Sequence, residues 1–308
     1  MLRLASIQEA HFSRAWLTIG VFDGVHLGHQ HMIQDLVAGA RAAEAPSCVV
    51  SFFPHPAEIL RGERDNFYLT APGERSDLLA ALGVDLAITH PFDQQVAQTS
   101  ARDFISLLKE HLGFTILRVG PDFALGHDRE GSVGFLQRLG NEMNFAVQAV
   151  QPVKLDGEVV SSSRIRTLLR EGAVEAAARL LGRQYSLSGK VVRGAGRGHS
   201  LGIPTANLEI WKKRLVPAIG IYATRATLRG KTWGSVTSIG VRPTFNDNLP
   251  GPVVETYLLD FDDGQFYGET LTLDFIARLR HEEKFSSVDE LLAQIERDIQ
   301  AARSILAT

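Results

Sequence analysis

Short apolar runs alternate with segments of helical spacing along the first half of the chain. The runs are rich in branched and aromatic side chains, which is the pattern of strands buried on both faces. They cover residues 15–22, 47–53, 85–89, 115–119 and 145–150. Apolar residues at helical spacing predict helices at 30–45, 73–82, 100–112 and 132–141. Strands that alternate with helices predict an α/β fold, a Rossmann-like parallel sheet covered by helices on both faces.

The pattern changes from Tyr185 onward, where apolar residues recur with the period of two that is typical of strands. The candidate strands cover residues 185–193, 220–228, 232–239, 253–261 and 269–279. A final helix begins at Ser287, with Glu290 at capping-box spacing. Its apolar stripe, which we expect to pack on the barrel, is Val288, Leu291, Leu292, Ile295, Ile299 and Ala302. These elements predict a small antiparallel β-barrel with a terminal helix.

An alanine-rich segment of helical spacing, residues 172–182, joins the two patterns. It ends in Gly182, a typical helix stop, so the boundary is placed there and gives domains 1–182 and 183–308. A chain of 308 residues is long enough for two domains with separate cores.

Composition narrows the class of protein. A net charge of −3 disfavours a nucleic-acid-binding surface spread over the chain. Cys48 is the only cysteine, which excludes an internal disulfide and a cysteine-based zinc cluster and fits a reducing compartment. No apolar run approaches membrane-spanning length. We therefore expect a cytoplasmic protein with small-molecule substrates and no nucleic-acid or membrane partner, and a homo-oligomer stays open.

The stretch around His26 combines a strand, a turn that contains glycines, and a helix start. Gly24 and Gly28 allow a tight turn with close backbone approach. Backbone N–H groups and the helix dipole at such a helix start bind phosphate. His26 and His29 are three residues apart, so both rings lie on one side and can donate to phosphate oxygens. A turn with no function beyond its fold is the alternative for this spacing alone.

Two further candidates follow predicted strands, where ligands bind in parallel sheets. The segment Pro54-His55-Pro56 follows the second strand and equally fits a rigid strand exit. Asp122 follows the fourth strand and equally fits a turn former.

A polar helix start lies at residues 161–166. Serines before a helix are commonly caps, so Ser162 and Ser163 alone do not indicate a ligand. Together with the helix N-terminus and Arg166, their hydroxyls could bind a triphosphate.

The second half contains a glycine-rich loop, Gly194 to Gly202. It is no Walker P-loop, because no Gly-Lys-Ser/Thr ends it, and a flexible loop is the alternative. Thr205 and Asn207 follow at a spacing of two, so they share a face in an extended segment. A hydroxyl and an amide oxygen are suitable ligands for Mg²⁺ that carries nucleotide phosphates.

Longer motifs give these candidates a family. The string G-x-F-D-G-x-H-x-G-H at 20–29 resembles the HxGH signature of nucleotidylyltransferases, and in this full form that of bacterial FAD synthetases. Residues 161–166 resemble their second signature. The string G-x-x-x-G-x-P-T-A-N at 198–207 resembles riboflavin kinases. The same likeness continues in residues 220–223, 239–245, 255–261, 267–268 and 278–298. The chain as a whole resembles the bacterial bifunctional riboflavin kinase/FAD synthetase family.

This resemblance implies that ATP phosphorylates riboflavin to FMN, and that a second ATP adenylylates FMN to FAD with release of pyrophosphate. It implies Mg²⁺, ATP as co-substrate, and flavins as substrates and products. By family position, Glu255 becomes the base for the ribityl hydroxyl, and His26 and His29 stabilise charge on the phosphates. The implied phosphate contacts of the adenylyltransferase are Gly20, Phe22, Asp23, Gly24, Gly28, Ser162, Ser163 and Arg166, and the implied flavin or nucleotide contacts are His55, Pro56 and Asp122. The implied phosphate contacts of the kinase are Gly194, Gly196, Arg197, Gly198, Gly202 and Pro204, with Thr205 and Asn207 as metal ligands.

Three positions depart from the family's usual residues. Phe53 stands where an acidic residue is common before Pro-His-Pro, and Leu125 where an aromatic residue is common. Ser163 replaces the usual threonine and keeps the hydroxyl. The first two changes bear on the flavin affinity of the N-terminal site.

Two other functions are compatible with parts of the sequence. One is a nucleotidylyltransferase for another phosphorylated alcohol, with a flavin-responsive C-terminal module. The other is a non-catalytic flavin-binding regulator. The intact kinase segments disfavour the first, and the retained reactive residues disfavour the second.

Overall fold

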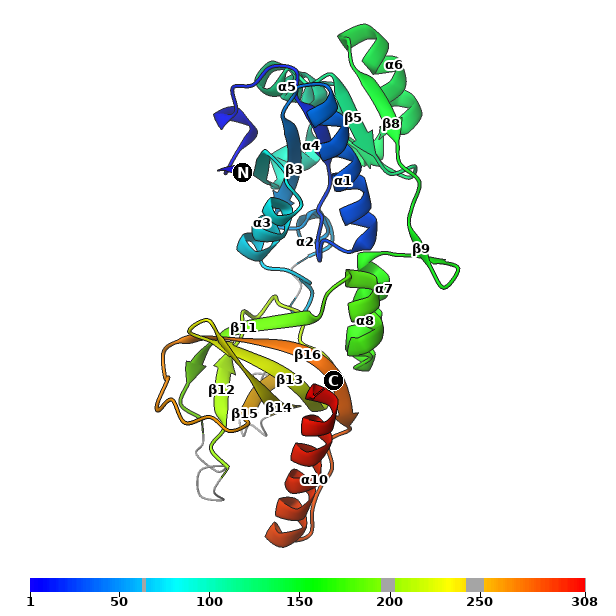
Figure 1. The fold of residues 1–308 in the computed structure, drawn as a ribbon. Helices are drawn as coiled ribbons and strands as arrows, with labels where there is room; N and C mark the ends of the chain where they lie inside the picture. The colour runs from blue at the N-terminus through cyan, green and yellow to red at the C-terminus, as the bar shows by residue number, and fades with distance from the viewer. Residues whose placement is uncertain (63–64, 195–202, 242–251, 308) are drawn as a thin grey trace. The chain divides into compact units, whose positions relative to one another are not determined.

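The computed structural model describes residues 1–62, 65–194, 203–241 and 252–307 (Figure 1). The chain forms two compact units. The first consists of Met1–Arg64 and Tyr68–Ser162, and the second of Asp65–Phe67 and Ser163–Thr308. Helices α7 (Ser162–Glu171) and α8 (Val174–Leu181) belong almost entirely to the second unit, and Gly182 ends α8 in the left-handed conformation. The functional boundary near Gly182 stays a prediction.

The first unit is built on a six-stranded parallel sheet with the order β1-β4-β3-β2-β5-β8. Its strands are β1 (Leu2–Leu4), β2 (Trp16–Ile19), β3 (Ser47–Phe53), β4 (Leu86–Pro91), β5 (Ile116–Val119) and β8 (Ala146–Ala149). Its α-helices are α1 (Leu27–Ala42), α2 (Pro56–Arg61), α3 (Pro72–Ala81), α4 (Gln94–Gln98), α5 (Ala101–Leu112) and α6 (Val133–Met143). The predicted parallel α/β fold is confirmed.

Smaller elements complete this unit. They are the 3₁₀ turns η1 (Ile7–Glu9) and η2 (His127–Arg129), and the two-residue pairs β6 (Ala124–Leu125) with β7 (Gly131–Ser132) and β9 (Lys154–Leu155) with β10 (Glu158–Val159).

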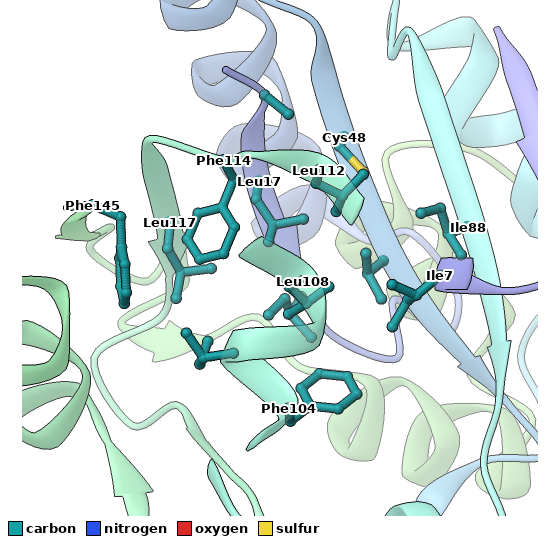
Figure 2. Close-up of a cluster of buried hydrophobic side chains, with 14 of the residues drawn as sticks. Ile7, Leu17, Cys48, Ile88, Phe104, Leu108, Leu112, Phe114, Leu117 and Phe145 are labelled. Carbon is teal, nitrogen blue, oxygen red and sulfur yellow. The ribbon is translucent and has the colours of Figure 1, made fainter. Parts of the chain in front are cut away.

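Two apolar clusters hold the sheet between its helices. The larger one joins the inner sides of α5 and α6 to one face of the sheet, where Leu108, Leu117 and Phe145 pack together (Figure 2). The second joins α1 and α3 to residues of the other face, with Ile33 and Leu79 in its centre. Because both faces are covered, ligands reach this sheet at its ends.

The second unit is a closed antiparallel barrel with the strand order β11-β12-β15-β14-β13-β16. Its strands are β11 (Tyr185–Val192), β12 (Ala206–Glu209), β13 (Gly220–Leu228), β14 (Lys231–Val241), β15 (Pro252–Leu258) and β16 (Thr270–Arg280). The predicted barrel is confirmed, and β12 is a strand that the sequence pattern did not predict. That short strand closes the barrel, because it pairs with both β11 and β15.

The terminal helix α10 (Val288–Leu306) contacts β13, β14 and β16, as the apolar stripe predicted. Ser287 caps it by accepting a hydrogen bond from the backbone N–H of Glu290 at 3.2 Å. The carboxylate of Glu290 bonds Ser286 rather than Ser287, so the predicted capping box is one residue out of register. Val288 is 56% exposed, so its predicted burial is wrong: it is the first residue of the helix and lies before the segment that packs on the barrel.

Candidate active sites

The turn between β2 and α1 has an unusual backbone. Phe22, Gly24 and Val25 all have positive φ angles, of 52°, 83° and 40°. Only glycine adopts this region without strain, so the conformations of Phe22 and Val25 have to be held by their surroundings. Strained backbone of this kind is concentrated at ligand sites.

The two histidines of this turn stack on each other. His26 is the N-cap of α1, and its Nδ1 accepts a hydrogen bond from the backbone N–H of His29 at 3.4 Å. The ring centroids are 3.6 Å apart with the planes 18° apart, and Phe22 meets His29 edge-on at 5.2 Å. Because Nδ1 accepts, the neutral His26 ring carries its proton on Nε2. The prediction that both rings lie on one side is confirmed.

Asp23 anchors this turn. Its carboxylate is 2% exposed and accepts hydrogen bonds from the backbone N–H groups of Leu69 and Thr70 and from the Thr70 hydroxyl, at 3.0–3.2 Å. The backbone N–H of Gly24 donates to the same hydroxyl at 3.1 Å. Ser162 donates to the backbone carbonyl of Asp23 at 2.8 Å, so the start of α7 meets the turn. Held in this way, the Asp23 carboxylate fixes the loop.

The Pro54-His55-Pro56 segment leads from β3 into α2. His55 is the N-cap of α2 and accepts a hydrogen bond from the backbone N–H of Ala57 at 3.0 Å. Its backbone N–H donates to the Tyr68 hydroxyl at 2.6 Å, and that hydroxyl donates to Glu58 at 2.8 Å. Burial and the nearby charges of Glu58 and Asp23 raise the pKa of Tyr68, so it stays a neutral donor.

The remaining predicted residues of this half are placed differently. Asp122 is exposed, and its backbone carbonyl accepts a hydrogen bond from Arg129 at 3.0 Å. Ser163 and Arg166 lie on α7 within the second unit. There the buried Arg166 donates from Nε to the Phe67 carbonyl at 2.9 Å, and its guanidinium lies 4.1 Å from the Phe67 ring centroid.

The barrel brings Asn207 and Glu255 together. They are opposite each other in the register of β12 and β15, and Ser238 on β14 lies on the other side of Glu255. Neighbouring residues in register point to the same face of a sheet. A Cβ atom on Gly194 would lie 2.2 Å from Nδ2 of Asn207, so only glycine fits there. Four kinase residues predicted to contact phosphate, Gly196, Arg197, Gly198 and Gly202, lie outside the described residues.

A cavity of about 490 Å³ in the barrel unit is lined by residues that neighbour this pair along the chain, although neither Asn207 nor Glu255 lines it. Pro204 and Thr205 line it together with Tyr257, which is two residues beyond Glu255 on the same strand. Most of the rest of its wall comes from the segment between Asp260 and Tyr267, where the Phe261 and Phe266 rings meet edge to face with centroids 4.9 Å apart. Only the two ends of this segment belong to the family motifs found in the sequence, and they were given no role, because aromatic residues alone do not indicate a ligand until a cavity is seen.

Residues suited to Mg²⁺ lie in the barrel unit. The hydroxyl of Thr205 and the side-chain oxygen of Asn207 belong to the class of hard oxygen ligands that this ion takes. Asn207 is 5% exposed and lies next to the Glu255 carboxylate in the sheet. In the described parts of the chain, no cluster of three histidine, cysteine, aspartate or glutamate residues could hold a metal ion.

The fold and these sites define a class: an α/β nucleotidylyltransferase unit with a histidine pair, joined to a barrel unit with a metal-type oxygen pair beside a carboxylate. Family models agree with each part. The FAD synthetase model matches residues 8–164 and the riboflavin kinase model matches residues 181–306. The chain belongs to the family of bifunctional riboflavin kinase/FMN adenylyltransferases.

Individual relatives support this membership. The bifunctional riboflavin kinase/FMN adenylyltransferase of Pseudomonas fluorescens is 39% identical over 94% of this chain and 92% of its own length. That of Escherichia coli K12 is 37% identical over 93% of this chain and 91% of its own. A solved structure described as a macrolide-efflux protein from Streptococcus pneumoniae has a TM-score of 0.89 and 28% identity, with 98% of both chains covered. Among the described residues of this chain, no helix is both long and apolar enough to span a membrane.

Proposed function

We propose that the two units carry out consecutive reactions, the phosphorylation of riboflavin to FMN and the adenylylation of FMN to FAD. The stacked imidazoles of His26 and His29 at the start of α1 carry the proposal. They supply two side-chain donors beside the N-terminus of α1, at the carboxyl end of a parallel sheet, which is what a nucleotide triphosphate needs.

In the first unit, an oxygen of the FMN phosphate attacks the α-phosphorus of ATP. The bond from that phosphorus to the bridging oxygen breaks, and pyrophosphate leaves with the electron pair. His26 and His29 stabilise the negative charge that builds up on the phosphate oxygens, which preorganised donors do without reorganising. We assign the grip on pyrophosphate to Ser162, Ser163 and Arg166, and nucleotide or flavin contacts to His55, Pro56 and Asp122.

In the second unit, Glu255 takes the proton of the 5′-hydroxyl of riboflavin as its oxygen attacks the γ-phosphorus of ATP. ADP leaves with the electrons of the broken bond. Thr205 and Asn207 would hold Mg²⁺, which neutralises phosphate charge when it is bound. Asn207 lies opposite Glu255 in the sheet, so the triphosphate and the base meet on one face. Positioning and charge neutralisation account for most of the rate in such transfers.

The test separates the two reactions in one chain. Purified protein is incubated with riboflavin, Mg²⁺ and ATP, and the flavins are separated over time. FMN followed by FAD supports the proposal. FMN alone contradicts the role of the first unit, and unchanged riboflavin supports a non-catalytic flavin-binding regulator. A cytoplasmic location and the absence of nucleic-acid partners stay predictions.

Two variants assign the steps. His29→Ala should let FMN accumulate while FAD formation falls, and Glu255→Gln should stop riboflavin phosphorylation but still convert supplied FMN. Loss of a general base costs roughly 10²–10⁴-fold in rate. Ser238→Ala, on the neighbouring strand, is the matched control for Glu255 and should keep both reactions. Riboflavin phosphorylation at the wild-type rate in Glu255→Gln would show that Glu255 is not the base.

A further inference from the structure

Arg75 is a buried charge that the proposed mechanism does not use. It lies on α3 and is 1% exposed, and no other described side chain so completely buried is larger. Arginine is almost never fully buried unless its charge and its donors find partners. Burial lowers the pKa of Arg75, and the nearby carboxylate of Asp23 opposes that shift. The groups that surround Arg75 must therefore compensate for the burial of its charge.

The guanidinium of Arg75 contacts the turn after β2 and the end of β3 at the same time. Nη1 donates to the backbone carbonyl of Val21 at 2.9 Å, in the strained turn that follows β2. Nη2 lies 3.4 Å from the carbonyl of Phe52, next to the end of β3. Its Nε has no hydrogen-bond partner among the described residues, so the side chain is held by these two carbonyls and by charge.

Both carbonyls precede candidate ligand residues. Val21 is followed within five residues by His26, and Phe52 is followed within three by His55. Buried polar groups around Arg75 join the same two segments. The Asp23 carboxylate anchors the first, and the neutral Tyr68 hydroxyl accepts a hydrogen bond from the backbone N–H of His55 in the second.

We infer that Arg75 is a positioning residue for FMN adenylylation: its planar fork sets the separation between the ends of β2 and β3, and thereby aims the histidine pair and His55 at one nucleotide. This inference rests on the proposed function of the first unit. A guanidinium presents donors in a fixed fork, whereas the ammonium of lysine is a point charge that cannot reproduce two fixed directions. Methionine has similar length but no donor.

Substitution should act on kcat more than on KM. The backbone N–H groups at the start of α1 remain and bind ATP in the ground state, while the histidines act on charge that develops in the transition state. A misplacement of about 1 Å costs on the order of 10²-fold in rate. We expect Arg75→Met to lower kcat for FMN adenylylation by about that factor, with KM for ATP within roughly threefold of wild type. The kcat of Arg75→Lys for FMN adenylylation should lie between those of wild type and Arg75→Met.

The experiment measures both reactions of each full-length variant, at a temperature where circular dichroism shows it folded. Riboflavin phosphorylation in the same chain is the internal control and should stay unchanged. Leu108→Ala, in the apolar cluster on the other face of the sheet, is the control for general destabilisation of the first unit. It should lower the melting temperature but keep the kcat for FMN adenylylation.

Each outcome decides the inference. Wild-type kcat in Arg75→Met, an equal loss in Leu108→Ala, or an Arg75→Lys variant no better than Arg75→Met would overturn it. If Arg75→Met does not fold, Arg75→Lys decides alone, and wild-type kcat in that variant would refute the two-carbonyl clamp. Failure of the wild-type protein to make FAD from supplied FMN would instead refute the proposed function.

Discussion

Gly28 offers a sharp test of the histidine geometry. It is the second residue of α1, and a Cβ atom there would lie 3.2 Å from Cε1 and Nδ1 of the His26 ring. Contacts that close force the ring to move by a few tenths of an ångström. Since about 1 Å costs on the order of 10²-fold, we expect Gly28→Ala to lower kcat for FMN adenylylation roughly 4- to 10-fold.

The same change, Gly28→Ala, should leave the stability of the fold unchanged or raise it. Alanine is favoured over glycine inside helices by up to about 1 kcal/mol, less in the first turn. Gly73→Ala is a matched control, because Gly73 is also the second residue of its helix, α3, and a Cβ atom there would meet nothing within 4 Å. It should raise the melting temperature by about 1–4 °C and leave both reactions unchanged.

The assay follows FAD formation from supplied FMN and riboflavin phosphorylation in both variants, beside thermal unfolding. The second reaction should be unaffected by either change. Full adenylylation activity in Gly28→Ala would refute the argument that the His26 ring must stay where this structure places it. Equal losses in Gly28→Ala and Gly73→Ala would instead point to the helix starts and not to the ring.

Three further predictions concern other parts of the chain. Gly194→Ala would place a Cβ atom 2.2 Å from Asn207 Nδ2 and displace that side chain, so KM for Mg²⁺–ATP in riboflavin phosphorylation should rise at least tenfold. An unchanged KM would show that Asn207 does not bind the metal of the nucleotide. His90, 6% exposed, accepts the backbone N–H of Ile7, and burial lowers its pKa below the usual 6.5. The folded-state pKa of His90 therefore lies below its unfolded value, so protons bind the unfolded chain more readily. In urea unfolding, the contribution of His90 to the free energy of unfolding should not change above pH 6.5 and should fall below it by up to about 1.4 kcal/mol per pH unit. His90→Asn should remove this pH dependence. Arg280 donates to both carboxylate oxygens of the 5%-exposed Asp298 at 2.8–2.9 Å, and Asp298→Ala should destabilise the barrel unit by about 3–5 kcal/mol in urea, whereas an effect under 1 kcal/mol would contradict its burial as a pair.

Local patterns predicted the elements whose cause is local. The mainly apolar run at 47–53 predicted strand β3 with the bounds that the structure has, because a strand buried on both faces carries few polar side chains. The start of α1 was placed three residues late, at residue 30 instead of Leu27. The capping side chain is a histidine, which is not among the usual N-cap residues.

Features that depend on distant residues could not be predicted. Strand β1 has only three residues, two of them exposed, and exists because β4 offers it a parallel edge. Strand β12 reads as a polar segment and is a strand only because β11 and β15 flank it. The burial of Arg75 could not be predicted, since nothing near it in the sequence marks the carbonyls of Val21 and Phe52. The relative placement of the two histidines could be predicted because it depends on local geometry alone. Two residues three apart at a helix start lie on the same side of the helix, whatever the rest of the chain does.

The proposed triphosphate sites of the two units differ in the charge of their side chains: the first uses hydrogen-bond donors, and the second contains a carboxylate. In the first unit the groups proposed to contact phosphate are donors, and the buried Asp23 carboxylate already accepts hydrogen bonds from the backbone N–H groups of Leu69 and Thr70. In the second unit the proposed base is the carboxylate of Glu255, which lies opposite Asn207 in the sheet. A carboxylate about 5 Å from one phosphate charge is repelled by ~3 kcal/mol at an effective dielectric constant of 20. On the proposed assignment, that face would bind ATP only with its charge neutralised, which is the role given to the oxygen ligands Thr205 and Asn207. Removal of divalent cations should consequently weaken ATP binding more in the barrel unit than at the histidine pair.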